Sequence, residues 1–343
     1  MPAYEIRAAL PEDEDQLFAV AGHLDTVNLP DDRRAIREIL DTSLRSFNGD
    51  IKDIRKREYV FVLRDLAAER VIGTSMIIAQ LGRRDAPYIY FDVLEEEKYS
   101  ASLDKHFAHT VLRIGYSYAG PTEIGGLILL PEHRRVPERL GQFLSYIRFL
   151  YLATHRPLFR DEILAELLPP LQSDGTSHLW EALGRHFTDM SYADADILSK
   201  KNKEFIKQLF PEGVIYGSVL SKAAQDVIGK VGSQTRGVEK MLRRIGFRYA
   251  HRVDPFDGGP HFTAMTEEIT LVQRSSRAPV TEILDETTAG KALIAVESPK
   301  APFFQSVLGR LEHGPNSRVA IGRDAATYLG VGVGDEVLTL PLD

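Results

Sequence analysis

Histidine and aspartate side chains gather around one turn in the last third of the sequence. His251 and His261 flank residues 253–260, a segment that contains Asp254 and Asp257. An imidazole titrates near neutral pH and can act as a general acid or base. A carboxylate can orient a cationic ligand. These four residues are therefore candidates for proton transfer and for holding a positive charge, and a solvated or capping histidine is the alternative interpretation of each imidazole.

Basic residues form a second group with potential chemistry, just before an apolar helical segment. Arg134, Arg135 and Arg139 lie in a loop that leads into Gly141 and Ser145. Guanidinium groups can form charge-assisted hydrogen bonds with anionic ligands. This loop therefore concentrates positive charge just before a helix, and a solvated basic loop is the alternative interpretation.

Metal and nucleotide motifs are weak in this sequence. His106 and His109 are three residues apart, but no nearby carboxylate pair completes a ligand set. The glycines of 330–334 precede Asp335 and Glu336, which would repel a phosphate, so this segment predicts turns. The chain has no cysteine, which excludes disulfides, thiolate nucleophiles and Cys-ligated metal centres. We expect no metal and no permanently bound cofactor.

Composition limits the class of protein and its partners. The 343 residues are 43% hydrophobic and 27% charged, which is typical of a globular protein, and this length predicts two domains or one large domain with an appendage. A formal net charge of -7 makes nucleic acid an unfavourable partner. The longest apolar run, 143–153, is interrupted by Arg148, and acidic residues 12–15 precede any apolar stretch. We therefore expect no membrane span, no secretory signal and a cytoplasmic location.

Periodicity predicts an alternation of helices and strands. Helical spacing marks 12–23, 33–47, 140–152, 178–187 and most of 194–247. β-branched and aromatic residues mark strands at 4–9, 59–64, 70–78, 88–93, 123–130, 163–167, 248–255 and 261–272. We expect the strands of 59–93 to form an antiparallel meander. After a connector at 275–279, short strands at 293–296, 318–321 and 336–340 predict a small β-rich C-terminal unit.

Several strings, taken together, resemble one known family. They include Leu183-Gly-Arg-His-Phe187, Ala224-Gln-Asp-Val-Ile-Gly229 and Val253-Asp-Pro-Phe-Asp-Gly-Gly-Pro260, with Glu123-Ile-Gly-Gly-Leu-Ile-Leu-Leu-Pro131 and Trp180 in register. The sequence resembles the arginine N-succinyltransferases, which are similar to the GCN5-related N-acyltransferases. The resemblance spans nearly the whole chain and is weakest before Tyr59 and after Arg274.

The resemblance implies a fold and a reaction. The fold is α+β, with a mixed central sheet flanked by helices and two related α/β units. The reaction joins succinyl-CoA and the α-amine of arginine to give N-succinylarginine and CoA. Leu127, with Leu129, lies on the strand that contacts the acyl-CoA, and the Arg134–Ser145 junction receives its phosphates. Asp254 or Asp257 would orient the amine, which attacks the thioester directly because no covalent nucleophile is evident.

The site positions differ from the family pattern in four places. The family's proton-donor histidine corresponds to Gly232, and His251 and His261 are the candidate substitutes. The phosphate loop contains Pro137 and fewer glycines than the family pattern, and Leu168 stands in place of an arginine. Residues 23–30 keep only the Leu-Pro ending of a glycine-rich segment. A changed acyl or amine preference is therefore one alternative.

The sequence leads to two functional hypotheses. The first is an N-acyltransferase of arginine N-succinyltransferase type, with succinyl-CoA or another acyl-CoA as co-substrate and an amine such as arginine as acceptor. The alternative is a non-catalytic homologue that acts as a binding or assembly partner, which the glycine at 232 favours. We expect an acyl-CoA-binding unit at 1–190, a second unit at 191–274 that completes the substrate site, and the C-terminal unit at 275–343. A homo-oligomer, or a hetero-oligomer with a paralogue, is also expected.

Overall fold

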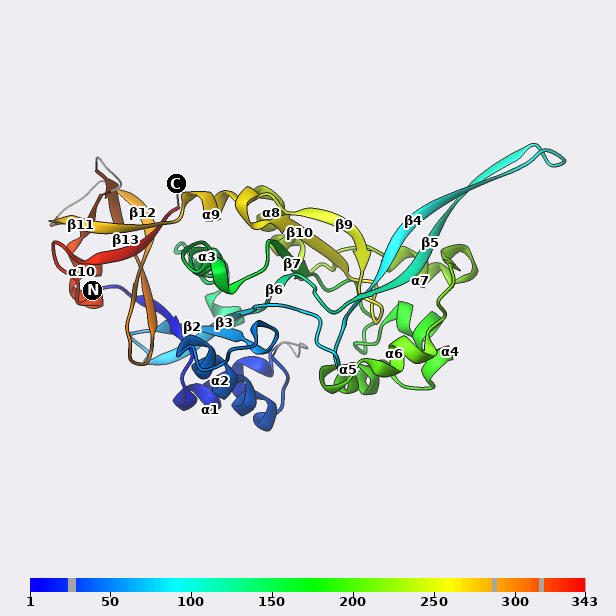
Figure 1. Ribbon diagram of the computed structural model, residues 1–343, viewed down its shortest axis with the longest axis horizontal. Helices are drawn as coiled ribbons and strands as arrows, with labels where there is room; N and C mark the ends of the chain where they lie inside the picture. Colours follow the sequence, from blue (N-terminus) through cyan, green and yellow to red (C-terminus); the bar gives the residue numbers. More distant parts are fainter. Residues whose placement is uncertain (24–28, 286–288, 315–317, 343) are drawn as a thin grey trace. The chain divides into compact units, whose positions relative to one another are not determined.

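The structure is a computed structural model that describes residues 1–23, 29–285, 289–314 and 318–342 (Figure 1). The chain forms two compact units, each assembled from segments distant in sequence. Unit 1 comprises Met1–Gln80, Ile124–Asp161 and Thr266–Asp343, and unit 2 comprises Leu81–Glu123 and Glu162–Met265. The expected boundaries at 190 and 274 do not coincide with these units, because the chain leaves unit 1 and returns to it twice. Whether 1–190, 191–274 and 275–343 are separate folding domains stays a prediction.

Antiparallel strands and two helices form the first part of unit 1. Strand β1 (Tyr4–Ala8) pairs with β2 (Glu58–Asp65), which pairs with β3 (Arg70–Ile78). Residues 59–63 of β2 are all buried, the pattern of a strand covered on both faces. Helix α1 (Glu14–Ala21) packs on β3, and α2 (Arg33–Phe47) packs on β2. These elements confirm the helices and strands expected in this part of the chain.

Helix α2 begins and packs as its sequence directs. The Asp32 side chain caps the helix by accepting a hydrogen bond from Ala35 N at 2.7 Å. Ile36 and Leu40 are buried one turn apart on the side that faces the sheet. The Ser43 hydroxyl, also buried, accepts a hydrogen bond from Val60 N at 2.9 Å. Apolar packing and a polar contact together fix this helix on β2.

The junction that carries the candidate phosphate residues lies in unit 1. Strand β6 (Thr122–Leu129) enters this unit at Ile124 and is followed by helix α3 (Leu140–Thr154), which packs on β3. Eleven of the 15 residues of α3 are buried, so the helix is covered on almost all sides. The strand and helix expected at 123–130 and 140–152 are confirmed.

Five C-terminal strands close into a ring in unit 1. Strand β13 (Phe304–His313) pairs with β12 (Gly290–Glu297) and β14 (Val319–Gly322), and β11 (Ser276–Leu284) and β15 (Glu336–Pro341) complete the circuit. The ring is filled by buried Val, Ile, Leu and Ala side chains and covered by α10 (Arg323–Leu329). The edge of β13 that faces away from β12 pairs with β1. The expected β-rich C-terminal region is confirmed, and it is joined to the N-terminal sheet.

Unit 2 is built on a mixed set of strands. Strand β7 (Glu162–Glu166) pairs in parallel with Thr122 and Glu123 of β6 and antiparallel with β10 (Pro260–Met265). Next come β9 (Arg248–Val253), β4 (Tyr88–Ser100), β5 (Lys105–Ser117) and the short β8 (Ile215–Tyr216). Together with the parallel β11–β14 pair of unit 1, this arrangement confirms the mixed α+β architecture.

Helices cover the strands of unit 2 around an aromatic core. They are α4 (Arg185–Thr188), α5 (Tyr192–Lys201), α6 (Glu204–Leu209), α7 (Lys222–Val227) and α8 (Arg236–Arg244). Trp180 is fully buried and stacks on Phe256 with ring centroids 5.0 Å apart. Its indole N–H donates to the Met190 carbonyl at 3.0 Å. Trp180 therefore belongs to the core, as its helical spacing predicts.

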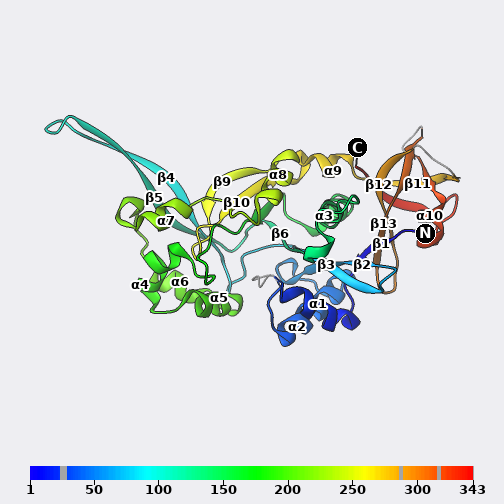
Figure 2. The same cartoon turned by 180° about the vertical axis from the view of Figure 1, so that it is seen from behind.

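A long hairpin is a feature of unit 2 that the sequence analysis missed. Strands β4 and β5 pair from Tyr88–Ser117 to Ser100–Lys105, and the hairpin extends away from the unit's helices in both views (Figures 1 and 2). Its outer half carries exposed Tyr99, Leu103 and Phe107. The expected meander is wrong in its third strand, since β4 pairs with β5 and β9. His106 and His109 lie on strand β5, where residues three apart point to opposite faces. The two imidazoles therefore do not share a face, as they would on a helix.

The remaining differences from expectation involve strands near turns. The expected strand 261–272 ends at Met265, its last three residues lie in helix α9 (Thr270–Arg274), and the expected connector at 275–279 lies mostly in β11. Strand β13 was not expected, and residues 24–28 of the segment 23–30 lie outside the described residues. A π-helical turn spans Trp180–Gly184. Short 3₁₀ turns span Pro11–Asp13, Ile54–Lys56, Pro131–His133, Arg156–Leu158, Gly217–Val219 and Thr266–Glu268.

Helix length and polarity bear on membrane insertion. In the part of the chain that the structure describes, no helix is both long enough and apolar enough to cross a bilayer.

A buried ion pair ties the start of α1 to β1. Arg7 Nη1 and Nη2 donate to the two carboxylate oxygens of Asp13 at 2.7 and 2.8 Å, and both side chains are less than 10% exposed. Asp13→Ala leaves a buried guanidinium without its carboxylate, so we expect the variant to lose about 3–5 kcal/mol of stability by urea denaturation. The control Glu38→Ala, which breaks an exposed pair with Arg34, should cost less than about 0.5 kcal/mol. Equal losses in the two variants would contradict this interpretation.

Candidate functional site

The β6–α3 junction in unit 1 presents positive charge and backbone N–H groups. Gly126 of β6 has φ +55°, a left-handed conformation that bends the strand just before half-buried Leu127. Leu129 is buried, and Gly141 is half-buried in the first turn of α3. The N-cap residue Arg139 makes no side-chain capping bond, so the dipole end of a 15-residue helix is available to an anion.

The arginines of this junction differ in what they contact. Arg134 Nε donates to the Leu129 carbonyl at 2.8 Å, which anchors the loop to the end of β6. Arg135 and Arg139 have φ of +64° and +55°, and all three side chains are exposed at the start of α3. The loop therefore holds its shape with two left-handed arginines, and it concentrates positive charge at a helix N-terminus.

Ser145 lies deeper than a phosphate contact would require. Its side chain is fully buried, and its hydroxyl accepts a hydrogen bond from Arg148 Nη2 at 2.7 Å. Arg148, 2% exposed, also donates to the Gly125 carbonyl at 3.3 Å, and burial lowers the pKa of its guanidinium to about 9. Ser145 therefore helps to hold a buried cation that connects α3 to β6.

Unit 2 contains a compact group of acidic and imidazole side chains. The antiparallel register of β7 and β10 sets His261 opposite Glu166, with His261 Nε2 at 3.4 Å from Glu166 Oε1. His261 is fully buried, and its Nδ1 lies 2.8 Å from the hydroxyl oxygen of Tyr88 on β4. Three strands thus align a carboxylate, an imidazole and a phenol. We call Glu166, His261, Tyr88 and Asp254 the acid–imidazole cluster.

The turn after β9 supplies the aspartates of this region. Asp254 Oδ1 accepts hydrogen bonds from Phe256 N at 2.7 Å and Asp257 N at 3.3 Å. Asp257, 7% exposed, accepts one from Gly259 N at 2.7 Å. Both expected substrate-binding aspartates therefore shape the turn itself, and Asp254 also faces the acid–imidazole cluster, with a carboxylate oxygen within 4.8 Å of ligand atoms on Glu166 and His261.

Desolvation and like charges shift the protonation of these groups. Burial, with Glu123 and Asp254 nearby, raises the pKa of Glu166 well above its usual range, although 35% of its side chain still reaches solvent. Burial raises the pKa of Asp257 in the same direction. Burial lowers the pKa of His261 to about 3, so this imidazole is neutral at neutral pH. The cluster therefore combines a neutral imidazole with a carboxyl group that binds protons tightly.

Gly232 leaves no room for a side chain. A Cβ atom there would lie 2.7 Å from the Pro169 carbonyl oxygen and 3.0 Å from that of Leu168, and Gly232 N donates to the Leu168 carbonyl at 2.8 Å. Gly229 N donates to the Gly258 carbonyl at 2.9 Å, which confirms that the 253–260 turn lies beside the segment ending at Gly232. A histidine at 232 would require the Leu168–Pro169 backbone to move.

His251 does not join the acid–imidazole cluster. It is exposed on β9, has φ +54° where the pairing with β10 is irregular, and contacts the ring of Tyr249. Of the two histidines predicted to move protons, only His261 is brought together with carboxylates in the described structure. Glu166 and Tyr88 were missed; the weak signal for Glu166 was a charged residue at the end of an apolar strand.

The geometry of the cluster also bears on metal binding. The ligand-type atoms of Glu166, Asp254 and His261 lie within 4.8 Å of one another, a separation that a cation between them could span. The expectation that the chain binds no metal therefore stays a prediction.

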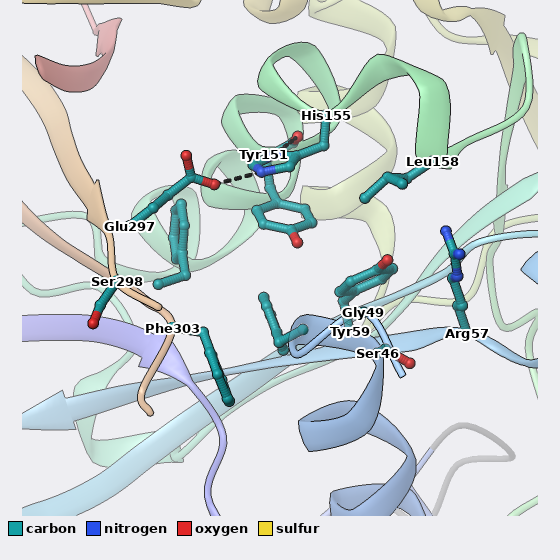
Figure 3. A pocket seen from close by; sticks show the side chains of 12 residues that line it. Ser46, Gly49, Arg57, Tyr59, Tyr151, His155, Leu158, Glu297, Ser298 and Phe303 are labelled. Atoms are coloured by element: carbon teal, nitrogen blue, oxygen red, sulfur yellow. Dashed lines mark hydrogen bonds and ion pairs between the residues drawn. The ribbon is translucent and has the colours of Figure 1, made fainter. Parts of the chain in front are cut away.

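Unit 1 contains a separate aromatic pocket of about 190 Å³ (Figure 3). The rings of Tyr59 and Tyr151 are 5.2 Å apart, and Tyr151 stacks on His155 at 4.0 Å. His155 Nε2 lies 2.5 Å from Glu297 Oε1, and this contact lowers the pKa of Glu297 to about 2. Many of the lining side chains are aromatic rings that pack against one another and connect α2, α3 and the β12–β13 hairpin. The lining residues are Ser46, Phe47, Gly49, Arg57, Tyr59, Tyr151, His155, Leu158, Glu297, Ser298, Phe303 and Phe304.

Comparison with known proteins gives matches along the whole chain. The family described as "Arginine N-succinyltransferase beta subunit" matches residues 4–271. The chain belongs to the arginine N-succinyltransferase family. The resemblance stated from the sequence is thereby confirmed, and the named members of this family are acyltransferases. Acyl-CoA is accordingly the class of co-substrate that membership implies.

Named relatives extend the match beyond residue 271. An arginine N-succinyltransferase of Yersinia pestis is 30% identical over 98% of this chain and 97% of its own length. The arginine N-succinyltransferase subunit alpha of Pseudomonas aeruginosa is 30% identical over 94% of each chain. The solved structure of arginine/ornithine succinyltransferase subunit AI from the same organism has a TM-score of 0.83, 27% identity and 99% coverage of both chains. The fold of this arginine N-succinyltransferase family member is therefore shared over its full length.

The close contact at Gly232 makes a testable prediction. We expect Gly232→Ala to destabilise the protein by about 1–3 kcal/mol, because its Cβ would meet backbone oxygen that has little freedom to move. The matched control is Gly237→Ala in α8, where nothing lies within 4 Å and alanine should stabilise the helix by up to about 1 kcal/mol. Urea denaturation of both variants measures the difference, and a neutral Gly232→Ala would show that the Pro169 backbone yields.

The His155–Glu297 contact predicts a pH-dependent contribution to stability. The pKa of Glu297 is depressed in the folded state, so its stabilisation is present above its ordinary value of 4.5 and is lost as pH falls toward about 2. Glu297→Gln should cost about 1 kcal/mol at pH 7, after allowance for solvent screening. This deficit should shrink between pH 4.5 and 2, as measured by denaturant unfolding at several pH values, while exposed Glu312→Gln shows no such trend. A deficit independent of pH would contradict it.

Proposed function

We propose that this chain is an acyl-CoA-dependent N-acyltransferase that transfers the succinyl group of succinyl-CoA to the α-amine of arginine. The observation that carries the proposal is the full-length match to proteins named for this activity, at 30% identity over 98% of the chain. Two further features support it. The basic β6–α3 junction suits the phosphates of CoA, and the acidic side chains of unit 2 suit a cationic amino acid.

The reaction needs a free amine and a polarised thioester. The amine nitrogen attacks the carbonyl carbon, the C–S bond breaks, and CoA leaves as a thiolate that takes up a proton. In this proposal the bent backbone of β6 around Leu127 and Leu129 polarises the carbonyl through N–H groups. Arg135 and Arg139, beside the N-terminus of α3, hold phosphate, with Gly141 allowing close approach. Asp254 contributes negative charge that favours the cationic substrate.

Two alternatives follow from departures already seen in the sequence. Leu168 stands where the family has an arginine, which favours a donor other than succinyl-CoA if that arginine binds the succinyl carboxylate. Gly232 favours a non-catalytic homologue that serves as a binding or assembly partner. The family description and the P. aeruginosa relative both name subunits, which accords with assembly, and both homo- and hetero-oligomerisation stay predictions.

The deciding experiment is calorimetric titration with succinyl-CoA, acetyl-CoA and CoA, followed by a thiol-release assay with arginine or ornithine as acceptor. We expect saturable succinyl-CoA binding and arginine-dependent thiol release. The double variant Arg135→Asn/Arg139→Asn should weaken CoA binding about tenfold, because asparagine tolerates the left-handed backbone but lacks the charge. Lys56→Asn, away from this junction, is the matched control and should change the Kd less than twofold.

Each outcome distinguishes the hypotheses. Thiol release with a different donor or amine would replace the substrate assignment and keep the enzyme class. Absence of binding for any CoA species at millimolar concentration would reject the acyltransferase and favour the non-catalytic homologue.

A further inference from the structure

One nitrogen in the acid–imidazole cluster is buried without a hydrogen bond. His261 is fully buried, and its Nδ1 is engaged by the Tyr88 hydroxyl at 2.8 Å. Its Nε2 has no hydrogen-bond partner among the described residues and lies 3.4 Å from Glu166 Oε1. An unsatisfied buried polar atom is energetically unfavourable, so a small approach of the carboxylate would be favourable. The Tyr88 contact therefore leaves His261 Nε2 facing Glu166 Oε1, where the two atoms can form a hydrogen bond.

Glu166 and His261 differ in access to solvent. The Glu166 side chain is 35% exposed, whereas that of His261 is 0% exposed. Tyr88 is buried as well, at 4% exposed, so a ligand at this site would meet the carboxylate first. An exposed carboxylate followed by a buried imidazole and a phenol is the arrangement of a proton acceptor supported by a positioning chain.

We propose that Glu166 is the proton acceptor for the attacking amine and that His261, held by Tyr88, is the positioning residue that orients the Glu166 carboxylate. This proposal rests on the proposed N-acyltransferase function. It assigns the catalytic proton transfer to Glu166 of unit 2 and not to position 232, where this chain has a glycine.

The proton balance of this step is complete. An α-ammonium group must lose one proton to become nucleophilic, and the nitrogen loses a second after it bonds to the carbonyl carbon. Glu166 accepts one proton at a time and passes it to solvent through its exposed side. The departing thiolate takes one proton, so the net reaction releases a single proton along with amide and CoA thiol.

Burial and neighbouring charges together favour protonation of Glu166 and a neutral His261. Burial has the largest effect on the pKa of Glu166. Glu123 of β6 and the two aspartates of the turn after β9, Asp254 and Asp257, raise this pKa further, whereas Lys203 between α5 and α6 lowers it. Those that act on His261 are Arg252 of β9 and Lys203, in addition to burial. A carboxylate crowded by other carboxylates is a stronger base than an isolated one, which suits abstraction of a proton from an ammonium group.

The cluster also has a structural interpretation, in which His261 only fills the interior. That interpretation predicts that substitutions change stability and leave the pH dependence of catalysis unaltered. The proposal instead predicts a pH profile that depends on Glu166 and shifts when His261 is replaced.

The test is the pH profile of kcat/KM for thiol release in four proteins: wild type, Glu166→Gln, Glu166→Asp and His261→Asn. Wild type should lose activity as pH falls, with a midpoint above the usual range of glutamate. Glu166→Gln should lower kcat/KM roughly 10²–10⁴-fold, and Glu166→Asp should recover part of the loss with a pH-dependent profile. His261→Asn should shift the midpoint and lower kcat. Glu212→Gln, an exposed change between α6 and β8, is the matched control.

Two results would overturn the proposal. One is Glu166→Gln with kcat/KM within threefold of wild type and the same pH profile. The other is activity that a chelator abolishes and Zn²⁺ or Mn²⁺ restores, which would assign the cluster to a metal.

A second measurement separates failure of this proposal from failure of the proposed function. Imidazole ¹⁵N NMR of His261 requires no turnover, and wild type should show a neutral ring from pH 5 to 9 whose Nε2 shift changes in Glu166→Gln. Titration of His261 near pH 6.5, unaffected by Glu166→Gln, would reject the pairing even in an active enzyme. If the protein gives the expected NMR result but releases no thiol, the Glu166–His261 pairing stands and only the proposed acyltransferase function is rejected.

Discussion

The backbone ladder between β7 and β10 is the interaction on which the candidate chemistry of unit 2 depends. It sets His261 opposite Glu166, and it continues where Leu167 N donates to the Pro260 carbonyl at 3.2 Å. The next carbonyl along the chain, that of Leu168, accepts from Gly232 N. One line of hydrogen bonds therefore joins three segments that are remote in sequence. A register slip of one residue would turn Glu166 away from His261 and disrupt the contact at Gly232.

Both units keep charged groups in poorly solvated surroundings by supplying neutral polar partners. In unit 1, Arg148 is held by the Ser145 hydroxyl and the Gly125 carbonyl, and in unit 2 backbone N–H groups hold the carboxylates of Asp254 and Asp257. Neutral partners stabilise a charge less than an opposite charge would, so burial shifts the pKa of each of these groups toward its neutral form.

Much of the fold follows from local pattern, whereas the site depends on long-range pairing. Helices such as α2 and α3 were predicted because their apolar residues recur at helical spacing. Strand β5 was missed because its outer half is polar and exposed, and β13 because its pattern is broken by glycine. His261 and Asp254 were recognised by residue type near a turn. Glu166 was not, because its role depends on a register with β10 that local sequence does not encode. Gly232 was recognised as a departure, but its tight contact with the Pro169 backbone required coordinates.

Strand β13 pairs both within the C-terminal ring and with β1, and this has a consequence for the division of the chain. The family match ends at residue 271, yet β13 covers the free edge of β1 at Glu5–Arg7, and Gln305 Nε2 donates to the buried Glu5 carboxylate at 2.5 Å. A chain cut after 271 would expose a row of unpaired backbone groups and leave that carboxylate without its amide partner. The C-terminal ring therefore protects the edge of the sheet that carries the N-terminal part of unit 1.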